Sequence, residues 1–151
     1  MVIEMYILAP GIKADLVKHW ALPDRVFFAS GACHILAYAF LDAYPTANFR
    51  AVWIKPKPGF TGNHIVAVRG DTAFDYHGYA GWSGLLEHMR VKANRWWPGW
   101  TAELVPLPKD VLVSEMKSRQ YDRLWLREPG QYLHDAMPRA QQFLLRFPRP
   151  D

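Results

Sequence analysis

Three residues whose side chains can cooperate in nucleophilic chemistry follow one another along the chain. Cys33, which is the only cysteine, is followed by His64 and then by Asp75. A thiolate is a strong nucleophile, a histidine beside it acts as its base, and a carboxylate that accepts the far ring N–H orients the histidine. The order Cys, His, Asp therefore predicts attack on a carbonyl carbon, provided that the fold brings the three side chains together.

Cys33 stands where a buried helix is expected to begin. Residues 33–44 are apolar on nearly every side, and Pro45 ends the pattern. Ser30 or Gly31 is suited to the N-cap. Free backbone N–H groups and the helix dipole at such an end favour thiolate over thiol. The alternative is that Cys33 is a small buried apolar residue, which is the more common role of a lone cysteine.

A predicted β-hairpin places His64 near Asp75. Residues 63–69 and 72–76 have the pattern of two strands joined by a two-residue turn at Gly70-Asp71. In that register the two side chains share a face as diagonal neighbours, roughly 7–8 Å apart at Cα, which a hydrogen bond can span. A slip of one residue would send Asp75 to the opposite face. Each residue also has a structural interpretation, as a strand end or as part of the turn at His77-Gly78.

The remaining pattern predicts an α+β fold with further helices toward the C-terminus. Strands are expected over residues 49–55 and 102–107, with a strand or extended arm over 2–8 and a turn over 78–81. Helices are expected over residues 12–20, 82–93, 121–126 and 132–147 and downstream of Pro108, with Pro138 kinking or restarting the last one.

Composition favours one globular domain over residues 1–151. Half of the residues are hydrophobic and 15% are aromatic, and no apolar run is long enough to cross a bilayer. The net charge of +4 is mild, and the arginines at 139, 146 and 149 resemble a solvated face, so nucleic-acid binding is disfavoured. The first residues lack a basic start and include Glu4, which does not fit a secretory signal. A single cysteine excludes an internal disulfide and fits a cytoplasmic location.

The order of these residues resembles a known superfamily. Gly31-Ala32-Cys33 opening a helix, His64 opening a strand and Asp75 on the next strand resemble the papain-like cysteine hydrolases in their minimal bacterial forms. NlpC-type peptidases, transglutaminase-like proteins and arylamine acetyltransferases share this order, and the resemblance covers about residues 30–79. It implies a papain-like fold in which the helix that carries the cysteine packs on an antiparallel sheet.

The resemblance also implies a function. Cys33 would be the nucleophile, His64 the base and Asp75 the orienting residue of a cysteine hydrolase. The implied chemistry is hydrolysis, deamidation or acyl transfer at amide-type bonds through a thioester. The implied substrates are proteins, peptides or small amides, and no cofactor is needed.

The sequence departs from papain in the oxyanion hole, where papain has a glutamine shortly before its cysteine. Here that position falls in residues 26–28, which carry no amide side chain. The backbone N–H of Cys33 is one donor, and Ser30 and His19 remain open as the second. Residues 55–62 and 96–100 are the stretches least explained by a core pattern, and at least one is expected to border the cleft.

Two other interpretations of the same residues stay open. Cys33, His34, His64, Asp75 and His77 together have the side chains of a zinc site, but none of their spacings is typical of one, which disfavours a metal. A non-catalytic interaction module that retains the fold and binds through its aromatic rim is the alternative function.

Overall fold

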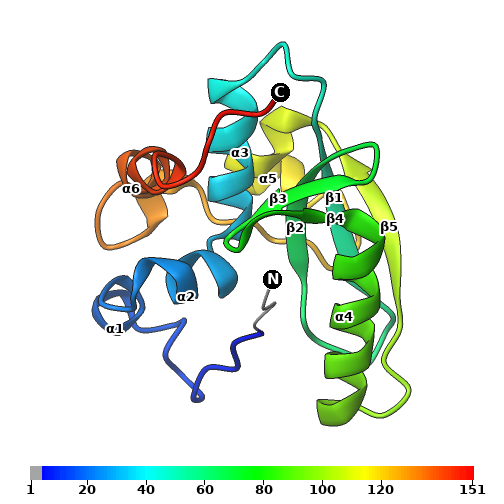
Figure 1. Cartoon of the computed structure of the whole chain (residues 1–151). Helices are drawn as coiled ribbons and strands as arrows, with labels where there is room; N and C mark the ends of the chain where they lie inside the picture. Colours follow the sequence, from blue (N-terminus) through cyan, green and yellow to red (C-terminus); the bar gives the residue numbers. More distant parts are fainter. Residues whose placement is uncertain (1–4) are drawn as a thin grey trace.

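A five-stranded antiparallel sheet, with strand order β4-β3-β2-β1-β5, forms the centre of the computed structural model, which describes residues 5–151 (Figure 1). The strands are β1 (Arg50–Pro56), β2 (His64–Arg69), β3 (Thr72–Asp75), β4 (Gly78–Gly81) and β5 (Ala102–Leu107). The α-helices are α1 (Leu16–Trp20), α2 (Asp24–Ala29), α3 (Cys33–Ala43), α4 (Trp82–Trp96), α5 (Glu115–Ser118) and α6 (Ala136–Leu144). Two 3-10 helices are η1 (Lys109–Val113) and η2 (Pro129–Gln131). The fold is α+β.

Helices cover both faces of the sheet. On one face Trp53, Ile65 and Phe74 join the core formed with α2, α3 and α6. On the other face Val52 and Val66 join the core beneath α4, so that α4 lies on the opposite side of the sheet from α3 (Figure 1). Alternate residues of a strand point to opposite faces, and a strand buried on both is apolar throughout. This explains the continuous apolar run in β2.

The central helix α3 begins at Cys33, as the sequence predicts. Its N-cap is Ala32, which directly follows the candidates Ser30 and Gly31, and no side chain caps the first turn. Phe40 is fully buried and stacks on Phe74 with ring centroids 4.3 Å apart. This contact holds α3 against β3, so the predicted packing of the cysteine helix on the antiparallel sheet is confirmed.

The β2–β3 hairpin has the predicted register. Arg69 pairs with Thr72, and two further pairs follow along the strands. Gly70 adopts φ +57°, the left-handed conformation that a two-residue hairpin turn requires. The Asp71 carboxylate accepts a hydrogen bond from the backbone N–H of Ser83 at 2.9 Å, and this bond fastens the turn to the first turn of α4.

Residues 78–81 form strand β4, so their prediction as a turn was wrong. Asp75 pairs with Gly78, which makes Tyr76-His77 the two-residue turn between β3 and β4. Gly78 has φ +90°, and a Cβ there would lie 2.8 Å from the ring of Phe147. Glycine is therefore required at this point, and the tight turn places His77 directly beside Asp75.

The N-terminal helices differ from the expectation. The helix predicted over 12–20 is only α1, because the side chain of Asp15 accepts from the N–H of Lys18 and caps the helix there. Helix α2 was missed, since its start at Pro23-Asp24 resembled a break. Asp24 is held by Arg139 of α6, with Nε and Oδ1 2.8 Å apart. Arg139 is thus a partly buried member of an ion pair and is not part of a solvated face.

The helix predicted over 121–126 was wrong. Arg123 adopts φ +60°, which ends any helix, and the chain continues in an extended form to Arg127. Leu124 and Leu126 are buried while Trp125 between them is exposed. The alternation arises because this segment lies against the region around Cys33, a contact that local propensity does not encode.

The C-terminal helix is shorter than predicted. Helix α6 replaces the expected helix over 132–147, and Pro138 lies within its first turn. Proline causes no kink there, because the N–H groups of a first turn have no helical partner. The helix expected after Pro108 is divided into η1 and α5 at Ser114, whose side chain caps α5.

The other predicted elements have these outcomes. The strands over 49–55 and 102–107 correspond to β1 and β5, and the helix over 82–93 is α4. Of the arm predicted over 2–8, residues 2–4 lie outside the described part, and residues 5–8 form no regular structure. Within the described residues, no helix has both the length and the apolar character needed to cross a membrane.

Candidate active site

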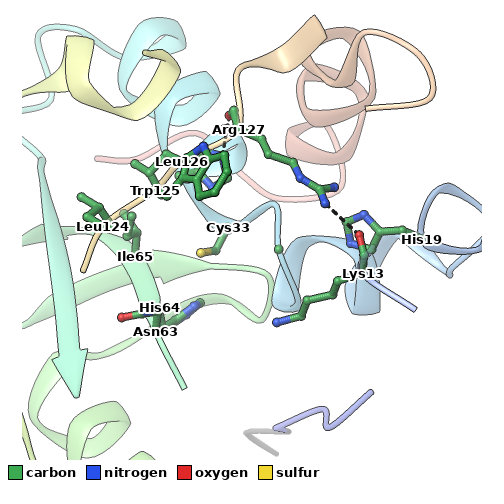
Figure 2. Close-up of a pocket in the computed structure, with 12 residues that line it drawn as sticks. Lys13, His19, Cys33, Asn63, His64, Ile65, Leu124, Trp125, Leu126 and Arg127 are labelled. Atoms are coloured by element: carbon green, nitrogen blue, oxygen red, sulfur yellow. Dashed lines mark hydrogen bonds between the residues drawn. The ribbon is translucent and has the colours of Figure 1, made fainter. Parts of the chain in front are cut away.

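Two of the three residues singled out in the sequence, Cys33 and His64, line one pocket, and Asp75 is hydrogen-bonded to His64. The pocket has a volume of about 240 Å³ and is open to solvent on one side of α3. Figure 2 shows the Cys33 side chain pointing into this pocket, with His64 and Asn63 across from it. The lining residues are Lys13, His19, Gly31, Cys33, His34, Asn63, His64, Ile65, Leu124, Trp125, Leu126 and Arg127.

His64 and Asp75 are in direct contact, as the hairpin register predicts. Nε2 of His64 lies 2.8 Å from Oδ2 of Asp75, and both side chains are buried. A carboxylate only accepts hydrogen bonds, so Nε2–H donates, and Nδ1 is the ring nitrogen left for Cys33. Asp75 thereby holds the ring in one orientation.

The electrostatic surroundings favour a thiolate at Cys33. Burial raises the pKa of the thiol, but hydrogen bonds with the side chains of His34 and His64, together with their charges, lower that pKa to about 5. The helix N-terminus acts in the same direction. Near neutral pH the sulfur is therefore negatively charged.

His64 carries the opposite charge. Burial lowers its pKa, but the hydrogen bond with Asp75 and the interaction with Cys33 outweigh burial and raise the pKa to about 10. Burial likewise raises the pKa of Asp75, whereas hydrogen bonds from His64 and His77 bring it well below its ordinary range. The result is a thiolate–imidazolium pair supported by a buried carboxylate.

His77 is a second histidine on Asp75, which the sequence suggested only as a metal ligand. Its Nδ1–H and its backbone N–H both donate to Oδ1 of Asp75, each at 2.9 Å. The two carboxylate oxygens of Asp75 therefore receive three hydrogen bonds from two histidines. The tight β3–β4 turn creates this arrangement, because it brings residue 77 back beside residue 75.

His34 is a second histidine beside the sulfur, and sequence reasoning missed this role as well. Its Nε2 lies 2.8 Å from the carbonyl oxygen of Arg127, which can only accept. Nε2 therefore carries the proton and Nδ1 is the nitrogen available to Cys33. Adjacency in the sequence was the only available signal, and the ring orientation depends on a residue 93 positions away.

Of the two candidates for the second oxyanion donor, His19 already uses one ring nitrogen on a backbone carbonyl. Nε2 of His19 donates to the carbonyl of Ser30 at 2.6 Å. Asn63 offers a donor instead. Its Oδ1 accepts a hydrogen bond from the indole N–H of Trp53 at 2.9 Å. This bond fixes the orientation of the amide, with Nδ2 directed away from the Trp53 indole. Asn63 lines the pocket beside His64, a placement that the sequence did not indicate.

The predicted rim segments, residues 55–62 and 96–100, contribute to a hollow next to the pocket of Cys33. Gly62 and Trp97 line a second hollow, which shares Asn63 and His64 with the first pocket. Neither residue lines the pocket of Cys33 itself. The two segments therefore border the neighbouring hollow, on the far side of His64.

A metal site does not form from the candidate ligands. Within residues 5–151, no group of three or more His, Cys, Asp or Glu side chains is arranged to hold a metal ion. Asp75 uses both of its oxygens on His64 and His77. The donor atoms that the zinc hypothesis needs are thus engaged with one another.

Scans of the chain against protein-family models, curated proteins and solved structures give no match. The chemistry of the site therefore has to be argued from its own geometry.

Proposed function

We propose that the protein is a cysteine hydrolase with a papain-like arrangement, acting on an amide-type bond. Cys33 is the nucleophile, His64 the acid–base residue and Asp75 the residue that orients His64. The observation that carries the proposal is that Cys33 and His64 line the same pocket, while His64 is hydrogen-bonded at 2.8 Å to the buried carboxylate of Asp75. A purely structural cysteine has no need of a buried ion pair, which is costly to form.

The positions of the three residues in the fold support the papain-like arrangement. Cys33 opens the central helix, His64 is the first residue of β2, and Asp75 is the last residue of the neighbouring strand β3. This is the order on which the resemblance in the sequence rests.

The reaction follows from the charges at rest. The thiolate of Cys33 attacks the carbonyl carbon, and the carbonyl oxygen becomes an oxyanion. As the C–N bond breaks, Nδ1–H of His64 gives its proton to the leaving amine, and an acyl thioester remains on Cys33. Water then attacks the thioester, Nδ1 accepts its proton, and release of the acid restores the thiolate and the imidazolium.

The oxyanion is stabilised by two donors in this proposal. One is the backbone N–H of Cys33, at the uncapped start of α3. The other is Nδ2 of Asn63, whose orientation is set by the Trp53 indole. Two donors aimed at the developing charge form the standard solution to this step.

Replacement of Asn63 by alanine should lower kcat by roughly 10²–10³-fold, the usual cost of losing one oxyanion donor. The pKa of the Cys33 thiol should not move, because Asn63 is not among the groups that set it. Steady-state kinetics and the pH dependence of alkylation measure the two effects separately. A matched control is Asn94→Ala, since Asn94 bonds backbone groups at the end of α4 and does not line the pocket. Equal kinetics for the two variants would exclude Asn63 as a donor.

Alkylation of the single thiol tests the proposed function without a known substrate. The rate of reaction of Cys33 with iodoacetamide follows the thiolate fraction, so it falls as the pH drops through the pKa of the thiol. With the pKa lowered to about 5, labelling should persist to near pH 5. An unperturbed thiol loses reactivity below about pH 8.5.

Two variants assign the cause of the shift. His64→Ala removes the charged partner and should raise the inflection in the alkylation profile, and His34→Ala should raise it through the loss of the other hydrogen bond. His134→Ala is the control, because His134 packs on Trp20 and does not line the pocket. The interaction module would be favoured if the alkylation rate of the wild type had its pH inflection near the free-thiol value and if His64→Ala did not move that inflection.

A further inference from the structure

The active-site pocket has a cationic side, for which the described residues provide no acidic partner. Lys13 and Arg127 both line it, and none of its other lining residues is an Asp or Glu. Among the described residues, neither side chain forms an ion pair with a carboxylate. Elsewhere in the protein basic side chains do pair with carboxylates, as Lys109 does with Asp42 at 2.8 Å.

Contacts hold the two cations together despite their like charge. Nη2 of Arg127 donates to the backbone carbonyl of Lys13 at 2.9 Å, and its guanidinium lies 5.7 Å from the centre of the Tyr132 ring. Figure 2 shows this bond, with the Lys13 side chain extending toward Asn63 and His64. The bond joins residues 114 positions apart, and both residues line the pocket of Cys33.

The positive potential extends into the pocket wall. The pKa of His19 is lowered first by burial and then by the charges of Arg127 and Lys13 among others.

The opposite side of the pocket is apolar. Ile65, Leu124 and Trp125 lie there, across Cys33 from the two cations (Figure 2). The cleft is therefore cationic at one end and apolar at the other, with the nucleophile between them.

We propose that Lys13 and Arg127 bind a carboxylate of the substrate, close to the bond that Cys33 attacks. The substrate is then an amide with an acidic group on one side of the scissile bond and an apolar group on the other. This inference rests on the proposed function and adds the class of substrate to it. The carboxylate is either an acidic side chain or a free C-terminus, since both present the same two oxygens to the guanidinium and the ammonium.

Two alkylating reagents of nearly equal size test the charge preference. Iodoacetate carries a carboxylate and iodoacetamide does not, and both label Cys33, which is the only cysteine. The measured quantity is the ratio of their second-order rate constants, divided by the same ratio for glutathione. Lys13→Met and Arg127→Met should each lower this normalised ratio by about two- to fivefold, the range expected for one partly exposed charge. The difference in this normalised ratio between each variant and the wild type should become smaller in high salt, which screens the charges.

Lys18→Met is the matched control. It removes the same charge from an exposed residue of α1 that does not line the pocket. Arg127→Lys keeps the charge, so it should retain most of the ratio even if loss of the guanidinium contacts destabilises Arg127→Met. If Lys13→Met lowers the ratio no more than Lys18→Met does, the inference is wrong.

A protection experiment identifies the source of the carboxylate. Short peptides with a free C-terminus, peptides with a glutamate side chain and an amidated C-terminus, and the matching fully amidated peptides compete against iodoacetamide at Cys33. The proposal expects one of the carboxylated sets to slow labelling more in the wild type than in Lys13→Met. Equal protection by the fully amidated set contradicts it.

Failure of this inference is distinct from failure of the proposed function. The labelling ratio can be measured at any pH at which the thiol reacts, and it needs no turnover. An ordinary thiol pKa would overturn the hydrolase, whereas an unchanged ratio in the two charge variants would overturn only the carboxylate site.

Discussion

Replacement of Cys33 by serine should abolish turnover of any amide that the wild-type protein hydrolyses, a loss of roughly 10⁴-fold or more in kcat. The lowered pKa that makes the thiol a thiolate has no counterpart in serine, because a hydroxyl remains protonated at neutral pH even beside His64. The measurement is the initial rate of amide hydrolysis, together with the mass of the acid-quenched protein. The wild type should carry an acyl adduct on Cys33, and the variant should carry none.

The fold should survive this change. Serine has nearly the shape of cysteine, and Cys33 is only half-buried at the start of α3. The melting temperature should therefore stay within a few degrees of the wild type, and Cys33→Ala should lose turnover to the same extent. A Cys33→Ser variant that keeps a tenth of the wild-type rate would show that another group is the nucleophile.

Replacement of Asp75 by alanine should lower kcat by roughly 10⁴-fold, the cost found when the orienting carboxylate of a triad is lost. The carboxylate raises the pKa of His64 and fixes its ring through Nε2. Without it, Nδ1 no longer faces the sulfur reliably, and the imidazolium loses its counter-charge. The measurement is kcat across pH, in which the variant should show a lower maximum and an alkaline limb shifted to lower pH.

Asparagine should not rescue this position. Asp75 accepts three N–H donors, from the rings of His64 and His77 and from the backbone of residue 77. An amide has only one oxygen, so its NH₂ group would face a donor on one side. Asp75→Asn should therefore lose both activity and thermal stability.

His77→Ala is the graded comparison for Asp75. It removes only one of the three hydrogen bonds that Asp75 accepts, so its loss of kcat should be smaller than that of Asp75→Ala. If His77→Ala and Asp75→Ala were equally inactive, His77 would have a larger part in the site than supporting the carboxylate. If Asp75→Ala kept full activity, Asp75 would have no role in orienting His64.

Part of this site is determined locally by the sequence. The two-residue turn at Gly70-Asp71 sets the register of the β2–β3 hairpin, and that register brings His64 to Asp75. The start of α3 at Cys33 is also local. The apolar run behind it has the length of a helix, and Gly31 with φ +97° interrupts regular structure just before it. Short-range patterns therefore predicted the contact of His64 with Asp75, the helix start at Cys33 and the antiparallel sheet of the α+β fold.

The surroundings of the three residues were decided by the tertiary structure. The ring of His34 is set by the carbonyl of Arg127, and the cationic side of the pocket exists because Arg127 bonds the backbone of Lys13. The segment from Leu124 to Arg127 had the composition of a helix, but packing against the region around Cys33 holds it extended. Hydrogen bonds and burial between residues about a hundred positions apart have no local signature. Local patterns thus determined the placement of Cys33, His64 and Asp75, whereas long-range packing decided the charges and surfaces that line the pocket around them.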